Sequence, residues 1–143
     1  MNRKASGIPI QINNNCVVAS VHLDLDGRLL DLFRSELLSY CAKECPKGII
    51  LDVSGQRLID NKDFEKLRQI VDSAKMMGYS TIFSGFRSEV VASLVSLEVN
   101  LDRIIATRNL DEAFLILIEK DTKIEPEELP IKEDLDETED YEI

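Results

Sequence analysis

The sequence predicts an α/β fold with a mixed, mostly parallel sheet, an N-terminal β-hairpin and four helices, in the order ββαβαβαβα. Two observations lead to this prediction. Short β-branched runs alternate with longer stretches whose apolar residues recur at helical spacing, a pattern typical of parallel sheets covered by helices. The central run, 49–53, is apolar apart from Asp52 and lies between Gly48 and Gly55, which indicates a buried strand.

The first elements are a hairpin and a helix. Residues 8–12 alternate as a strand, 13–15 are three asparagines suited to a turn, and 16–23 indicate the returning strand. A helix is expected after Gly27, and Pro46 stops it.

The second half of the chain continues the alternation. Asp60 and Asn61 follow the central strand, and either side chain can cap a helix by accepting a backbone N–H. The expected elements are a helix from about Asp60 to Gly78, a strand over 79–83, a well-buried helix over 89–98, a short strand over 103–107 and a last helix from Asn109 or Asp111.

We expect an N-terminal extension over 1–7, a domain over 8–120 and a tail over 121–143 that its acidic charge sets apart. The tail holds eleven acidic residues and two lysines, a net of −9 that leaves −1 of the formal −10 for the rest. With Pro126, Pro130 and no apolar periodicity, we expect this tail to be disordered.

Composition excludes several classes of function. The domain has no basic stripe for a phosphate backbone, and charged residues interrupt every apolar run, so we expect no nucleic acid and no membrane partner. Cys16, Cys41 and Cys45 are an odd set without a disulfide framework, which favours the reducing cytoplasm. His22 is the only histidine, so we expect buried thiols, no metal site and no cofactor.

The ordered set of motifs resembles the STAS family, named for sulfate transporters and anti-sigma factor antagonists. The resemblance covers 8–120 and is densest over 48–60, where an apolar strand, Asp52, Ser54-Gly55 and Asp60 follow the family's pattern. Short stand-alone antagonists and stressosome scaffold proteins are the most similar subgroup, through Leu23-Asp24-Leu25-Asp26, Lys75-Met76-Met77-Gly78 and Ser84-Gly85.

This resemblance implies a bacterial, cytoplasmic, non-enzymatic domain that acts in stress signalling by docking. In the family, the second helix and the loop before it bind a serine-kinase-like anti-sigma or switch protein. STAS-containing sensor paralogues and a large oligomeric assembly are further implied partners. Transferred to this chain, the partner-binding surface comprises Ser54, Gln56, Arg57, Asp60, Asn61, Lys62, Asp63, Glu65 and Arg87, bordered by Ser84 and Ser88.

Asn61 departs from the family's pattern. Relatives carry a serine directly after the aspartate, and its phosphorylation adds a charge of about −1.5 to −2 that ends or redirects the interaction. An amide cannot accept a phosphate. The protein is then a permanently competent antagonist, an unswitched structural member, or a protein in which another hydroxyl, best Ser84, takes over.

Two alternative functions remain open at the level of sequence. In a response-regulator receiver-like domain Asp52 would accept the phosphoryl group and Ser84 would be the switch hydroxyl, although no lysine closes the late strand at Thr107-Arg108. A ligand-binding STAS sensor is the other, although no glycine loop for phosphate is present. We expect Asp52 to bind loop N–H groups rather than to catalyse, because no base, nucleophile or metal ligand accompanies it.

Overall fold

The computed structural model describes residues 6–21, 24 and 26–127, with 120–127 as backbone only. The order of elements in this part of the chain is the expected ββαβαβαβα. The elements are β1 (Ile10–Asn13), β2 (Cys16–Ser20), α1 (Gly27–Glu44), β3 (Ile49–Asp52), α2 (Asn61–Met76), β4 (Thr81–Ser84), α3 (Ser88–Ser96), β5 (Ile105–Thr107) and α4 (Leu110–Glu127).

The five strands form one mixed sheet in the order β1-β2-β3-β4-β5. β1 is antiparallel to β2, and every later pair is parallel. Asn14 and Asn15 make the hairpin turn with φ of 53° and 63°, a left-handed conformation that asparagine tolerates better than most residues. The expected hairpin and mostly parallel sheet are therefore confirmed.

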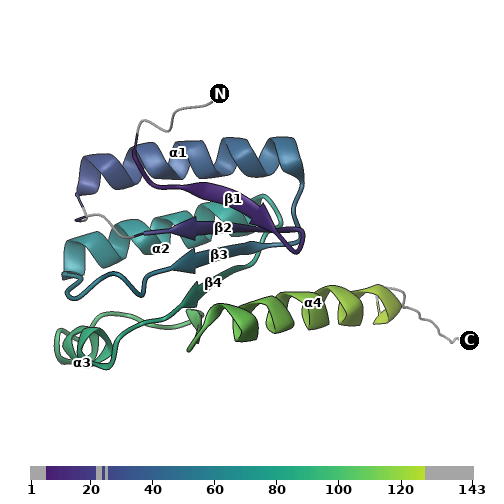
Figure 1. Ribbon diagram of the computed structural model, residues 1–143. Coiled ribbons are helices and arrows are strands. Elements are labelled where there is room, and N and C mark those ends of the chain that lie inside the picture. The colour runs from purple at the N-terminus through teal and green to yellow at the C-terminus, as the bar shows by residue number, and fades with distance from the viewer. Residues whose placement is uncertain (1–5, 22–23, 25, 128–143) are drawn as a thin grey trace, which may run out of the picture.

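Helices cover both faces of the sheet, with α1 and α2 on one side and α4 on the other (Figure 1). Ile49 and Leu51 of β3 lie in the core beneath α1 and α2, whereas Ile50 lies in a second core with Phe114 and Leu117 of α4. Because both faces of β3 are buried, its sequence is an apolar run rather than an alternation. The interpretation of this run as a central buried strand is confirmed.

The helix expected to be well buried is largely exposed. α3 buries Val90 and Leu94, but Val91, Val95 and Leu97 are 40, 59 and 50% exposed. α3 lies beyond the side of the sheet near β4 (Figure 1), so only one of its faces meets the core. The burial predicted for this helix is wrong, because no described element covers the face of α3 that carries Val91 and Val95.

α4 runs to Glu127, so the domain boundary expected at residue 120 falls within a helix. Residues 128–143 of the expected tail and 1–5 of the expected extension lie outside the described residues. None of the described helices is long and apolar enough to cross a membrane.

Candidate docking surface

Hydrogen bonds hold the loop between β3 and α2 at the carboxyl end of the sheet. The N–H of Val53 donates to the carbonyl of Ser84 at 2.9 Å, and the N–H of Ser54 donates to Oδ1 of Asp52 at 3.0 Å. Asp52 therefore binds a loop N–H, as expected of an aspartate at the end of a strand.

Gln56 lies inside this loop rather than on its surface. Its side chain is 6% exposed, and Nε2 donates to the carbonyl of Val21 at 2.7 Å. A buried carbonyl needs a hydrogen-bond donor, and the side chain of Gln56 supplies one to Val21. The predicted partner-binding residue Gln56 thus fixes the shape of the loop and offers no side chain to a partner.

Gly85 and Arg87 fix the same loop from the neighbouring strand. Gly85 has a φ of +84°, and a Cβ added there would lie 2.8 Å from Cβ of Ser54, so a larger residue would push the loop away. Arg87 is exposed, and its Nε donates to the carbonyl of Ser54 at 3.0 Å. Arg87 therefore positions the loop while its remaining surface faces solvent.

Asp60 caps α2, which decides between the two candidate capping residues. Its Oδ1 accepts from the N–H of Asp63 at 2.8 Å, and Asn61 is the first helical residue, with its side chain exposed. Asp63 is half-buried, and desolvation, followed by the nearby Asp60 and Asp26 carboxylates, raises the pKa of its carboxyl. The start of α2 therefore places the capping Asp60, the exposed amide of Asn61 and the carboxyl of Asp63 close together.

Most of the predicted residues lie together on an exposed surface. Leu58 belongs with them, because it is 70% exposed although the next residue, Ile59, is 1% exposed. The only signal in the sequence was this pair of apolar residues, of which one must face outward in an extended loop. We call the exposed set the junction surface: Ser54, Arg57, Leu58, Asp60, Asn61, Lys62, Glu65 and Arg87.

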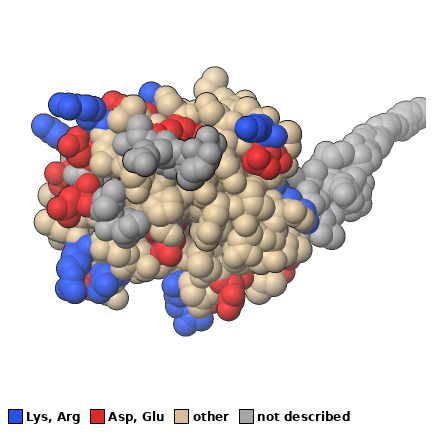
Figure 2. Space-filling view, turned by 45° about the horizontal axis from the view of Figure 1, so that its top comes forward, with Lys and Arg blue, Asp and Glu red and all other residues tan. Residues whose placement is uncertain are grey.

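Charges of both signs are mixed near the junction surface. Figure 2 shows acidic and basic side chains gathered at the end of the molecule where α2 begins, with no continuous basic stripe on the face in view. Such a surface suits a protein partner with charges of both signs better than a nucleic-acid backbone.

Ser84 is buried beside the junction surface. Its residue is 1% exposed, and it lines a cavity of about 370 Å³ with Asp52, Ser54 and the start of α4. A protein kinase needs an accessible hydroxyl, whereas Ser84 is almost fully buried at the end of β4. Ser88, at the first turn of α3, is exposed.

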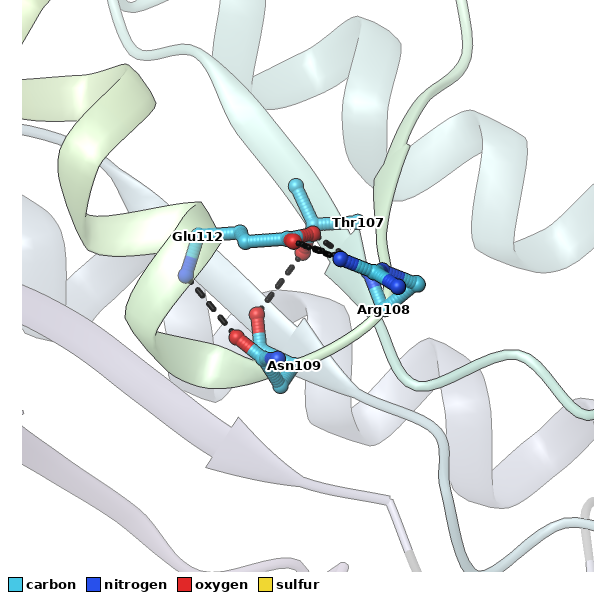
Figure 3. A network of polar contacts seen from close by, with 4 residues as sticks. All are labelled: Thr107, Arg108, Asn109 and Glu112. Atoms are coloured by element: carbon cyan, nitrogen blue, oxygen red, sulfur yellow. Dashed lines mark hydrogen bonds and ion pairs between the residues drawn. The ribbon is translucent and has the colours of Figure 1, made fainter.

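The start of α4, on the far side of that cavity, is held by a polar network (Figure 3). Oδ1 of Asn109 accepts from the N–H of Glu112 at 3.0 Å, and the hydroxyl of Thr107 donates to the carbonyl of Asn109 at 2.9 Å. Arg108 and Glu112 form an ion pair at 2.9 Å. Asn109 is therefore the cap of α4, and Asp111 lies in its first turn.

The cysteines are partly as expected. Cys16 and Cys41 are buried, and burial raises the pKa of the Cys41 thiol to about 11, so it is an unreactive core group. Cys45 is exposed, and the prediction of burial is wrong for it, because it follows the last packed turn of α1 with φ of 50°. His22 lies outside the described residues, and within them no group of three or more potential metal ligands occurs.

Comparisons with known proteins agree with this architecture. No family model matches the chain. The RsbT co-antagonist protein RsbRD of Bacillus subtilis is 28% identical over 77 residues, which are 54% of this chain and 28% of that protein. A variant of RsbS from Moorella thermoacetica has a TM-score of 0.70 at 22% identity, covering 80% of this chain and 97% of the other. A stressosome chain has a TM-score of 0.65 at 20% identity, and the match covers 79% of this chain and 98% of that one.

The chain folds as a STAS domain. The described STAS domain matches nearly the full length of the RsbS chain, whereas the match to RsbRD spans less than a third of that protein.

The sheet of this STAS domain differs from that of a receiver domain. Receiver domains have a parallel sheet in the order 2-1-3-4-5, whereas here the strands follow chain order and β1 is antiparallel at the edge. The order of the strands therefore contradicts the alternative of a receiver-like domain.

Proposed function

We propose that this STAS domain is a bacterial, cytoplasmic, non-enzymatic regulator that docks through the junction surface on a serine-kinase-like anti-sigma or switch protein. One observation carries the proposal: Asn61 is exposed directly after the capping Asp60, where the family carries its phosphorylated serine. The similarity to an RsbT co-antagonist protein and to stressosome chains supports a role in such a pathway.

Docking of this kind acts by mass action. Partner bound to the junction surface is withdrawn from whatever it otherwise restrains, so the output depends on the population of the complex. Leu58 offers an exposed apolar contact, and the charged residues of the junction surface set the orientation and rate of encounter. Because Asn61 cannot be phosphorylated and Ser84 is 1% exposed, we favour a permanently competent antagonist among the three explanations.

The substitution Asn61→Asp tests the surface. An aspartate in the first turn suits the helix dipole, so α2 should remain folded. The added charge, close to Asp60 and Asp63, should weaken partner binding by about tenfold or more. Asn13→Asp is a matched control, because it makes the same change on an exposed residue of β1.

Affinity capture of the tagged wild type and both variants from lysate of the source organism, followed by mass spectrometry, identifies the partner. Titration with the purified partner then measures the affinities. We expect a serine-kinase-like protein with the wild type and with Asn13→Asp, and much less with Asn61→Asp. Capture of a histidine kinase instead, or equal affinities of all three proteins, would reject the proposal.

We further propose that the domain assembles with STAS-containing paralogues. The likeness to a stressosome chain supports this. Light scattering of the purified protein, alone and with co-expressed paralogues, should give masses well above the 16.2 kDa of one chain. A monomer under both conditions would contradict it.

A further inference from the structure

We propose that a cavity at the end of the sheet remote from the junction surface binds a small organic anion, namely a phosphate or carboxylate attached to an apolar group. The cavity measures about 310 Å³ and lies between the last turns of α2, the start of β4 and the residues leading into β5. Small-molecule sites range from roughly 300 to 1,000 Å³, so a single ring with one anionic group fits this volume. The inference does not depend on the proposed docking partner.

Two basic side chains from different elements line the cavity. Lys75 comes from the last turn of α2 and Arg103 from the segment before β5, and neither forms an ion pair with another described residue. Asp72 and Asp102 are close in sequence, but no carboxylate is among the described lining residues. Two cations that converge on a cavity without a counter-charge favour an anionic occupant.

Thr81 lies in the wall of the cavity and carries an unpaired hydroxyl. It is 4% exposed, and its Oγ1 has no hydrogen-bond partner among the described residues. Buried polar atoms without partners are rare and unfavourable, so an unpaired hydroxyl beside a cavity calls for an explanation. Oγ1 is covered by neighbouring protein atoms, so a bound anion would reach this hydroxyl only after a small shift of the wall.

The rest of the wall suits an apolar group. Val71, Tyr79 and Ile105 are half-buried and line the cavity. The hydroxyl of Tyr79 donates to the carbonyl of Cys41 at 3.2 Å, which holds the ring in place. The combination of an apolar wall with a few converging polar groups is typical of ligand sites rather than of crevices between surface side chains.

Titration of the full chain, followed by ¹⁵N–¹H NMR, tests the site. The probes are phenyl phosphate and benzoate, which separate the two anion types, and phenol, which has the ring without the charge. We expect saturable shifts at the amides of Gly78, Thr81 and Arg103 with at least one anion, and millimolar affinity for so small a probe. The absence of saturation with both anions, or equal shifts with phenol, would overturn the proposal.

Variants show whether the cavity holds the probe. Lys75→Gln and Arg103→Gln should each weaken binding several-fold, whereas Lys43→Gln, which changes an exposed lysine at the end of α1, should not. Thr81→Val keeps the shape but removes the unpaired hydroxyl, so it should raise the Tm of the free protein. Binding that is unchanged in Lys75→Gln and Arg103→Gln would overturn the assignment.

Discussion

Gln56 helps to hold the loop between β3 and α2 in place through a buried hydrogen bond. Its amide reaches the carbonyl of Val21, 35 residues earlier in the chain, at 2.7 Å. The exposed side chains around it, Leu58 among them, are therefore presented on a loop whose backbone is anchored from within. Anchoring of this kind reduces the entropy that docking would otherwise have to overcome.

The substitution Gln56→Leu should destabilise the fold. Leucine leaves the buried Val21 carbonyl without this donor, which costs about 1–3 kcal/mol of unfolding free energy. Urea unfolding followed by circular dichroism measures the loss. Arg57→Leu, at the exposed neighbouring position, should stay within about 0.5 kcal/mol of the wild type. Equal losses in the two variants would show that the hydrogen bond does not matter.

At the scale of elements, α4 depends on the network at its first turn. Arg108 donates hydrogen bonds to Glu112, which lowers the pKa of the Glu112 carboxyl below its ordinary value of 4.5. A carboxyl whose pKa is lower in the folded than in the unfolded state stabilises the fold at pH values above its unfolded pKa. That contribution is lost as the pH falls through the lower, folded value.

We therefore expect Glu112→Gln to lower the Tm at neutral pH and to have less effect in acid. Thermal unfolding of both proteins at about pH 7 and about pH 3 provides the comparison. Because Arg108 is exposed and Glu112 is partly exposed, added salt should also reduce the difference at neutral pH. A difference that is constant across pH would mean that the carboxylate charge is not responsible.

α3 offers a matched pair of substitutions. Leu94 is 2% exposed and Val95 is 59% exposed, although they are adjacent in the same helix. Leu94→Ala should cost about 2–5 kcal/mol of unfolding free energy because it leaves a cavity. Val95→Ala should stay within about 0.5 kcal/mol, since it removes no buried contact. Denaturant titration measures both, and a large loss in Val95→Ala would place that face of α3 in an interface.

At the scale of the whole molecule, the two ends of the sheet carry two different candidate sites. The carboxyl ends of the parallel strands carry the junction surface, and the opposite end carries the Lys75 and Arg103 cavity. The cores on the two faces of the sheet lie between these ends and are rigidly packed.

Most of the net charge lies beyond the described part. Residues 128–143 contain eight acids and one lysine, a net of −7 of the formal −10, so their removal leaves −3. From its composition, we expect so acidic a segment to add little buried apolar surface. Truncation after Glu127 should therefore change the Tm by less than about 2–4 °C. Differential scanning calorimetry of both chains measures it, and a larger drop would mean that the tail packs on the domain.

Much of the fold was predictable because its signals are local. The apolar run of β3, the asparagine turn at 13–15 and the cap at Asp60 each act over a few neighbouring residues. Hydrophobic periodicity and capping depend on that short range. The position of the candidate surface followed from the same signals, since it lies where a strand ends and a helix begins.

The tertiary structure alone decided which side chains of that surface are available. Gln56 is buried because its side chain reaches the carbonyl of Val21 beneath the loop. Ser84 is buried where β4 lies between β3 and β5. Val95 is exposed because no described residue covers the outer face of α3. Lys75 and Arg103 line one cavity because the fold places the end of α2 beside the residues that lead into β5. Each of these outcomes depends on contacts between residues far apart in the chain, which local propensity does not encode.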